Sequence, residues 1–372
     1  MVEDRVKYVS SLYGGFWNFD IKDFSYLVNP YFPPQSFMLS LGSRLEDLVR
    51  SYPSTNWYIS SLMAKTLGLS HEEVVIANGA SELIDSISSR YISNLAVPIP
   101  TFDEYINRAI NQGRNVSMYH MGVDFQLDVD GFIRHVFDTD ANSALIVNPN
   151  NPTGKLLPVE SILKILDSLR HLDLIMIDES FLDFVQTDSN PSVAGSIYEY
   201  SNLVVLKSLS KTSGIPGLRL GYAISGNRDM VRQMRSDLPI WSINSMAQYF
   251  LEEIEKHLPA FADSCKMVAD ATDVLYQGLC TIPFIKPYPT RANFVLCEII
   301  SGTTVQELTS ALFSEFKMVV NNQSKKKGLD GEFVRIASRT KEENIQIIDA
   351  LGKLSLDYSN RIVDKEGTRV NK

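Results

Sequence analysis

A lysine and an aspartate, each at the end of an apolar run, are well placed to do chemistry in this 372-residue sequence. Lys211 follows the run Val204–Leu206, and Asp178 closes the run Ile175–Ile177. A lysine amine can form an imine with an aldehyde, and a carboxylate can keep a heterocyclic nitrogen protonated so that the ring takes up electrons. Taken singly, a solvated lysine and a helix-capping aspartate are the simpler interpretations. Together they suggest a site for an aldehyde cofactor, because a carboxylate at a buried strand end is costly unless it is paired.

Three further strings offer the donors that such a cofactor needs. Arg219 lies eight residues after the lysine, in the glycine-containing string Ile215–Tyr222. Asn151 lies in Asn148–Gly154, a string that by composition alone indicates only a turn. The segment Gly79–Ser81 joins an apolar run to a helical pattern, so its backbone amides can bind an anion at a helix N-terminus, although an ordinary turn fits this string equally well.

The elements around these residues alternate between short apolar runs and helical spacing, which predicts an α/β sandwich. The expected helices are Ser81–Tyr91, with Ser81 as its N-cap, Phe102–Asn111 and Val159–Arg170. The expected buried strands of a largely parallel sheet are Val74–Ala77, Leu95–Pro98, Ala144–Val147, Leu174–Ile177, Val204–Leu206 and Leu220–Ile224. Ligands of such sheets bind outside the carboxyl ends of the strands, where the candidate residues lie.

The later part of the chain has a different pattern. A long helical stretch runs from Trp241 to Leu279, and apolar runs and helices follow it. We therefore predict a large domain over residues 45–255, and a smaller domain that joins an N-terminal arm, residues 1–44, to residues 256–372. The Lys-, Gly- and Ser-rich segment Asn321–Gly331 is expected to be an exposed loop.

Composition excludes several classes of function. Acidic residues outnumber basic ones by 44 to 35, which leaves a formal charge of -9 and argues against nucleic-acid binding. Cys265, Cys280 and Cys297 lack metal or redox spacing, so we expect no metal site. The sequence has no signal-peptide core and no apolar run of about 20 residues, so no membrane span is expected. These features favour a cytoplasmic protein.

The strings resemble the class I/II aminotransferases, which depend on pyridoxal 5'-phosphate (PLP). Ser208–Lys211 is similar to the family's S-x-x-K motif, and Asn148–Gly154 is similar to its N-P-x-N-P-T-G motif. The resemblance covers nearly the whole chain. It implies fold type I, as in aspartate aminotransferase, with a large α/β/α domain around a mostly parallel seven-stranded sheet and a smaller α+β domain.

The resemblance also implies a role for each cofactor candidate. Lys211 would hold PLP as a Schiff base, with Asp178 on the pyridine nitrogen and Asn151 on the ring oxygen. Phe102 would stack on the ring, although a core phenylalanine fits that position equally well. Tyr52 would cross a dimer interface to the neighbour's phosphate, which makes the expected enzyme a homodimer with shared active sites. The residues implied to bind the phosphate of the same subunit are Gly79, Ala80, Ser81 and Arg219. Ser208 and Ser210 are implied to contact the cofactor.

Within the class, the chain most resembles the branch that holds histidinol-phosphate aminotransferase and threonine-phosphate decarboxylase. Arg335 would clamp the substrate α-carboxylate, and Arg339 would meet a second anion, although a surface ion pair explains Arg339 as well. Asn151 would also face the substrate. Tyr13 and Leu27 depart from the decarboxylase pattern, which has histidine and asparagine there, so we expect a changed substrate.

The expected reaction is transamination between an amino acid, which can carry phosphate or phosphonate, and a 2-oxo acid or aldehyde. Lys211, once released from the cofactor, would move a proton from the substrate α-carbon. A decarboxylase acting on a phosphorylated amino acid is the first alternative, and a cofactor-binding module without turnover is the second. The chain could also be one domain of a larger biosynthetic fusion.

Overall fold

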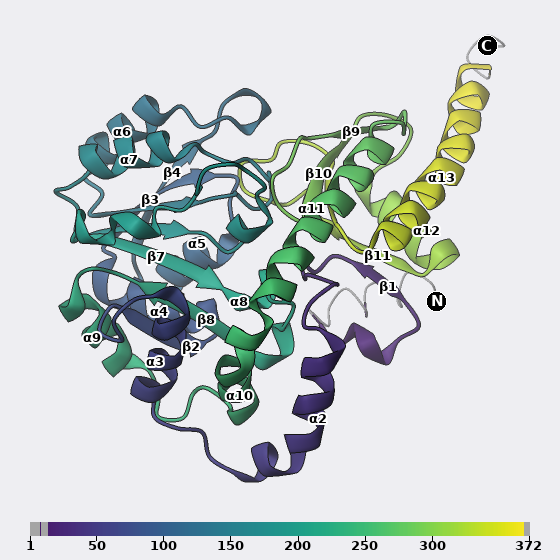
Figure 1. The fold of residues 1–372 in the computed structure, drawn as a ribbon. Coiled ribbons are helices and arrows are strands. Elements are labelled where there is room, and N and C mark those ends of the chain that lie inside the picture. The colour runs from purple at the N-terminus through teal and green to yellow at the C-terminus, as the bar shows by residue number, and fades with distance from the viewer. Residues whose placement is uncertain (1–7, 9–13, 368–372) are drawn as a thin grey trace. The chain divides into compact units, whose positions relative to one another are not determined.

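The computed structural model describes residue 8 and residues 14–367, with side chains as far as residue 356 (Figure 1). It divides into two compact units. We call Val28–Asn151 with Lys155–Met267 the large unit, and Met1–Leu27, Pro152–Gly154 and Val268–Lys372 the small unit. Each unit is described by itself.

A seven-stranded sheet forms the centre of the large unit, within residues 28–267. Its strand order is β2-β8-β7-β6-β5-β3-β4. All neighbours pair in parallel except β8, which is antiparallel to both β2 and β7. The mostly parallel sheet predicted from the apolar runs is therefore confirmed. The strands are β2 (Val74–Asn78), β3 (Asn94–Ile99), β4 (Asn115–His120), β5 (Ser143–Val147), β6 (Leu174–Asp178), β7 (Leu203–Ser208) and β8 (Leu220–Ile224).

Helices cover both faces of this sheet, so its strands are apolar on both sides. In β6, Ile175 and Ile177 join one core, whereas Leu174 and Met176 join the other. The first core is packed by α3 (Asn56–Leu67), α6 (Val129–Asp138), α7 (Val159–Ser168) and α10 (Ser245–Glu253). The second is packed by α4 (Ala80–Tyr91), α5 (Asp103–Asn111) and α9 (Arg228–Asp237). The large unit also contains α2 (Gln35–Arg50) and α8 (Leu209–Thr212).

The small unit is built on a second sheet, which has five strands in its described residues and the order β1-β11-β12-β10-β9. One face of this sheet packs on an apolar core that includes residues from the helices. The strands are β1 (Lys22–Phe24), β9 (Ile285–Pro287), β10 (Phe294–Ile299), β11 (Met318–Asn322) and β12 (Phe333–Ala337). The helices that contribute to the core are α11 (Leu258–Leu279), α12 (Val305–Phe316) and α13 (Lys341–Gly367).

Some expected elements are wrong in detail. Gly79, rather than Ser81, is the N-cap of α4, because its φ of 79° turns the chain into a helix that begins at Ala80. The long helical stretch begins at Ser245 rather than Trp241, since the Asn244 side chain caps it by accepting from the Ala247 amide. Strand β4 was missed because its residues are only partly buried, so it has no continuous apolar run. The expected loop at Asn321 begins inside β11.

No helix in the described part of the chain is both long enough and apolar enough to cross a membrane. Among the same residues, no group of three histidine, cysteine, aspartate or glutamate side chains could hold a metal ion.

Candidate active site

Asp178 is a buried carboxylate at the carboxyl end of β6, and only 6% of its surface is exposed. Its Oδ1 accepts hydrogen bonds from the backbone amide of Ser180 at 2.9 Å and from that residue's hydroxyl at 2.5 Å. Its Oδ2 accepts from the hydroxyl of Tyr105 at 2.7 Å. Burial raises the pKa of Asp178, although these hydrogen bonds and the charge of Lys211 act in the opposite direction. The carboxylate is therefore held in one orientation and would be stabilised by a facing cation.

Tyr105 is the partner that the sequence did not reveal. It lies on α5, it is fully buried, and burial together with the charge of Asp178 raises its pKa well above 10. It therefore stays neutral at physiological pH and remains a hydrogen-bond donor to Asp178. The only signal in the sequence is a tyrosine on the apolar face of a predicted helix, and that pattern is typical of any core tyrosine.

Lys211 lies on the short helix α8, directly after β7. The end of β7 is tied to the end of β6, because the Ser208 amide donates to the hydroxyl of Ser180 at 2.9 Å. The Lys211 carbonyl accepts from the backbone amide of Asn29 at 2.9 Å. The charge of Lys211 lowers the pKa of Asp178, so the two predicted catalytic side chains interact electrostatically within the large unit.

Gly79 and Arg219 meet where β2 passes into α4. A Cβ on Gly79 would lie 2.7 Å from the Arg219 guanidinium atom Nη2, so a larger residue would displace the arginine. A Cβ on Gly221 would lie 2.3 Å from the backbone nitrogen of Ala80. The backbone of Gly79 and Ala80 at the start of α4 therefore lies close to β8 and near a guanidinium. Helix N-terminal amides and arginine are both suited to bind a phosphate.

Ser210 has a buried hydroxyl without a hydrogen-bond partner among the described residues. The residue is only 3% exposed. Buried hydroxyls nearly always find a partner, so an unsatisfied one in a candidate ligand site is most simply explained by a group that binds there. An acceptor-rich phosphate is such a group, which makes this serine consistent with the predicted phosphate site.

The string Asn148–Gly154 separates into structural and candidate residues. Asn148 exchanges two hydrogen bonds with the backbone of Leu157, at 2.7 and 3.1 Å. Asn150 donates to the Pro100 carbonyl at 2.9 Å and accepts from the Thr101 hydroxyl at 2.8 Å. Asn148 therefore closes the loop after β5, and Asn150 ties this loop to the loop after β3. Asn151, the predicted partner of the ring oxygen, is 6% exposed at the end of the same loop.

The two predicted aromatic contacts are accessible on the large unit. Phe102 precedes α5 and is 39% exposed, with its ring centroid 6.2 Å from that of Tyr105. Tyr52 is 79% exposed, and its ring centroid lies 4.4 Å from that of Trp241. Both rings therefore have a face available to a ligand or to another subunit.

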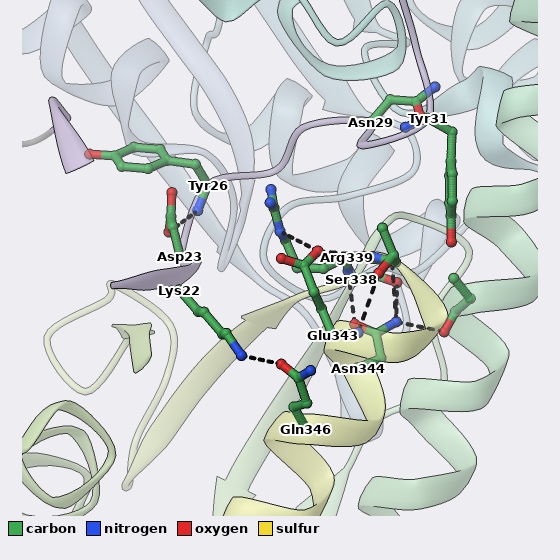
Figure 2. A network of polar contacts seen from close by, with 12 residues as sticks. Lys22, Asp23, Tyr26, Asn29, Tyr31, Ser338, Arg339, Glu343, Asn344 and Gln346 are labelled. Carbon is green, nitrogen blue, oxygen red and sulfur yellow. Dashed lines mark hydrogen bonds and ion pairs between the residues drawn. The ribbon is translucent and has the colours of Figure 1, made fainter. Parts of the chain in front are cut away.

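Apart from Asn151, the predicted substrate residues belong to the small unit. Arg335 lies on β12, is 9% exposed, and donates from Nη2 to the Ser25 carbonyl at 2.8 Å. Burial lowers its pKa to about 10. Arg339 follows the strand, and its Nε lies 3.3 Å from Glu343 Oε2. Figure 2 shows the two side chains as an ion pair. Leu27 is buried, and Tyr13 lies outside the described residues.

The cofactor candidates described above all lie in the large unit, and comparison with known proteins identifies their family. A family model of class I and II aminotransferases matches residues 51–351. The chain belongs to this family. The resemblance read from the motifs is thereby confirmed, as are fold type I and the branch with histidinol-phosphate aminotransferases and threonine-phosphate decarboxylases among its relatives.

Two relatives combine high identity with long coverage. The CMP-5'-(3-aminopropyl)phosphonate synthase of Streptomyces rubellomurinus is 35% identical over 94% of this chain and 56% of that protein. The chain thus spans about half the length of that relative. The L-serine phosphate decarboxylase of Sulfurospirillum multivorans is 30% identical over 90% of this chain and 88% of that protein.

Solved structures agree with this assignment. The histidinol-phosphate aminotransferase from Clostridium acetobutylicum is 27% identical, with a TM-score of 0.83 over 91% of this chain and 100% of that one. The enzyme from Sinorhizobium meliloti, solved in complex with PLP, shares the fold at 17% identity and a TM-score of 0.80, over 91% of each chain. The cofactor of this class I/II enzyme is PLP. The ring nitrogen, the aldehyde and the phosphate of PLP fit the large unit. This unit offers a buried carboxylate, a lysine near it, and a glycine-lined cradle beside Arg219.

Proposed function

We propose that this class I/II enzyme is a PLP-dependent decarboxylase of an amino acid that carries a phosphate or phosphonate group. The relatives support the reaction, since one is named a decarboxylase of serine phosphate and another is named for an aminopropylphosphonate. The observation that carries the substrate class is a pair of arginines in the small unit, Arg335 in the middle of β12 and Arg339 two residues after that strand.

The two guanidinium groups differ in how they are held. Arg335 is buried and fixed by a backbone carbonyl, which suits a rigid, bidentate contact with the α-carboxylate. Arg339 is paired through Nε with Glu343, and its two terminal nitrogens have no hydrogen-bond or ion-pair partner in the described part of the chain. Two guanidiniums are the groups expected to bind a substrate that has two anionic groups.

The large unit would hold the cofactor. Lys211 would bind its aldehyde carbon, and Asp178 would face the ring nitrogen, where a positive charge offsets the cost of burying the carboxylate. The phosphate would be bound by the amides of Gly79–Ser81, the hydroxyls of Ser208 and Ser210, and Arg219. Asn151 would face the ring oxygen, and Phe102 would cover the ring. PLP, when bound, supplies the electron sink for cleavage of a bond at the substrate α-carbon.

The role of Lys211 differs between the two reactions that this site could perform. In decarboxylation, its Nζ donates a proton to the α-carbon after carbon dioxide leaves. In transamination, the same nitrogen removes a proton from that carbon. An amine is suited to either role because it can both accept and donate a proton. The choice between decarboxylation and transamination would depend on which bond of the substrate α-carbon, the bond to the carboxylate or the bond to hydrogen, is held perpendicular to the plane of the conjugated cofactor.

Product analysis tests the proposal directly. Purified protein with PLP would be incubated with O-phospho-L-serine, O-phospho-L-threonine and 2-amino-4-phosphonobutanoate, each with L-serine as the unphosphorylated control. We expect carbon dioxide and the corresponding amine from at least one anionic substrate, and Arg339→Gln to reduce the preference for that substrate over serine. Turnover of serine by the wild type as efficient as that of every anionic substrate, or an unchanged preference in Arg339→Gln, would contradict the substrate class.

Transamination is the second candidate, and the fold match with histidinol-phosphate aminotransferase favours it. In that case the same incubations would yield pyridoxamine phosphate and an oxo product, with no carbon dioxide. The absence of both products and of any absorbance change would reject both reactions.

We also propose that the enzyme is a homodimer in which Tyr52 reaches the phosphate of the neighbouring subunit. Its ring is 79% exposed on the large unit, which leaves it accessible to a second copy. A single sedimentation species at the mass of one chain, in the presence of PLP, would contradict this arrangement.

A further inference from the structure

Asp23 and Arg335 lie on the same face of the small unit's sheet. Strand β1 pairs with β11 so that Asp23 is opposite Val319, and β11 pairs with β12 so that Asn321 is opposite Arg335. Paired residues, and residues two apart on a strand, project from the same face. The alternate residues Phe24, Met318, Val320 and Val334 belong to the apolar core. Asp23 and Arg335 therefore project from the face opposite the core.

The carboxylate of Asp23 organises the turn that follows β1. Its Oδ1 accepts from the Ser25 amide at 2.7 Å, from the Ser25 hydroxyl at 2.6 Å and from the Tyr26 amide at 3.2 Å. Figure 2 shows this carboxylate beside the Tyr26 backbone. An aspartate that accepts from the amides that follow it replaces a backbone turn with a side-chain one. The position of Ser25 thus depends on Asp23.

Ser25 in turn contacts the predicted carboxylate clamp. Its carbonyl accepts from Arg335 Nη2 at 2.8 Å, and both residues are less than a tenth exposed. A buried guanidinium must have its donors satisfied, so the position of this carbonyl restricts where Arg335 can point. The negative charge of Asp23 also opposes the lowering of the Arg335 pKa by burial.

We propose that Asp23 is a positioning residue for substrate recognition: its turn places the Ser25 carbonyl, and that carbonyl orients Arg335 toward the substrate α-carboxylate. The inference rests on the proposed function in one respect, namely that Arg335 binds that carboxylate. If Asp23 only shaped the N-terminal segment, the contact between Ser25 and Arg335 would not be needed, whereas a positioning role requires it.

Two substitutions separate hydrogen bonding from charge. Asp23→Ala removes the Oδ1 acceptor, whereas Asp23→Asn keeps an oxygen acceptor and removes the charge. We expect Asp23→Ala to raise KM for O-phospho-L-serine about tenfold with kcat within about twofold. Arg335 would bind the α-carboxylate less well in the variant, whereas the groups that act on the reacting bond are unchanged. Asp23→Asn should stay within about threefold of the wild type. Asp20→Ala, which removes an exposed carboxylate from the same segment, is the matched control.

A ligand without the carboxylate distinguishes positioning from general damage. Inhibition by O-phosphoethanolamine should be unchanged in Asp23→Ala, since that amine has no carboxylate for Arg335. The double variant Asp23→Ala with Arg335→Ala should be no worse than Arg335→Ala alone, because residues that act through one another are not additive. A KM unchanged in Asp23→Ala, or an equal loss for both ligands, would overturn the proposal.

A crystal structure of Asp23→Ala without substrate gives a readout independent of turnover. We expect the bond from Arg335 Nη2 to the Ser25 carbonyl to be lost or the guanidinium to be rotated. An unchanged bond in that structure would overturn the proposal, whatever the kinetics. If the wild-type protein releases neither carbon dioxide nor an oxo product, the proposed function fails, whereas the same crystal structure still decides whether Asp23 positions Arg335.

Discussion

The large and small units hold their candidate residues in different ways. In the large unit, the candidate residues contact one another or a buried neighbour: Tyr105 and Ser180 donate to Asp178, and Gly79 adjoins Arg219. In the small unit, Arg335 is oriented by a backbone carbonyl and Arg339 by a single carboxylate. The cofactor is the same throughout the family, so a rigid, mutually braced set suits it. Substrates differ among relatives, and substitution of a few residues that contact a guanidinium can change the direction in which it points.

The comparison predicts that damage to the large unit abolishes chemistry, whereas damage to the small unit changes which substrates are accepted. Four substitutions test it, and they are ordered below by the size of the expected effect.

The largest effect is expected from Lys211→Ala. The amine that would bind the cofactor and move the proton is lost, so turnover should fall by at least about a thousandfold. Borohydride reduction followed by mass spectrometry should find cofactor attached to the wild-type peptide that contains residue 211 and to no peptide of the variant. Lys164→Ala, on an exposed helix face, serves as the control. Covalent cofactor in the variant would move the attachment site elsewhere.

Arg335→Lys should act on substrate binding alone. Lysine keeps the positive charge but lacks the planar fork, so KM for the anionic amino acid should rise about a hundredfold, the cost of breaking a buried charged contact. Absorbance of the bound cofactor should not change, because the large unit is intact. Arg291→Lys, an exposed arginine in the same unit, should leave KM unchanged. A changed cofactor spectrum with normal KM would contradict the assignment of substrate binding to the small unit and of cofactor binding to the large unit.

Gly79→Ala tests the phosphate cradle. The added methyl group would lie 2.7 Å from Arg219 Nη2, at a backbone φ of +79° that disfavours alanine. We expect PLP to bind about tenfold more weakly, a loss of about 1.4 kcal/mol, measured by titration of the cofactor-free protein. Gly195→Ala is a suitable control, because no atom lies within 4 Å of its added carbon. Normal affinity in Gly79→Ala would exclude this contact from phosphate binding.

Tyr105→Phe should have the smallest effect on turnover and a measurable one on stability. It leaves the buried Asp178 without a hydrogen bond of 2.7 Å, which costs about 1–3 kcal/mol. Urea unfolding of the cofactor-free protein measures this loss. Tyr198→Phe removes a similar bond to Glu73 from an exposed tyrosine and should cost less.

The loss in Tyr105→Phe should also depend on pH. Burial raises the folded-state pKa of Asp178 above its usual 3.8, so its contribution to stability is present at low pH and is lost as pH rises through the folded pKa. Removing the donor that favours the anion raises that pKa further. The variant should therefore lose more stability relative to the wild type at pH 7 than at low pH, where Asp178 is protonated in both proteins. A loss of stability that does not depend on pH would mean that the Tyr105 hydroxyl does not change the pKa of Asp178.

Local patterns in the sequence predicted a large part of this protein. Apolar runs predicted six of the large unit's strands, because strands covered on both faces are continuously apolar. They missed β4, whose residues are only partly buried. The motif order predicted the family and the cofactor, since a strand end followed by a short turn places Asp178 and Lys211 without help from distant residues.

Tertiary structure alone decided which groups hold these residues. Tyr105 is 73 positions from Asp178, and Ser25 is 310 positions from Arg335. Periodicity indicates that a side chain is buried, but it contains no information about which polar group is buried next to it. That information arises only when distant strands and helices pack together, because hydrogen bonds need contact within about 3 Å. The candidate reacting residues could therefore be named from the sequence, whereas the partners that hold them could not.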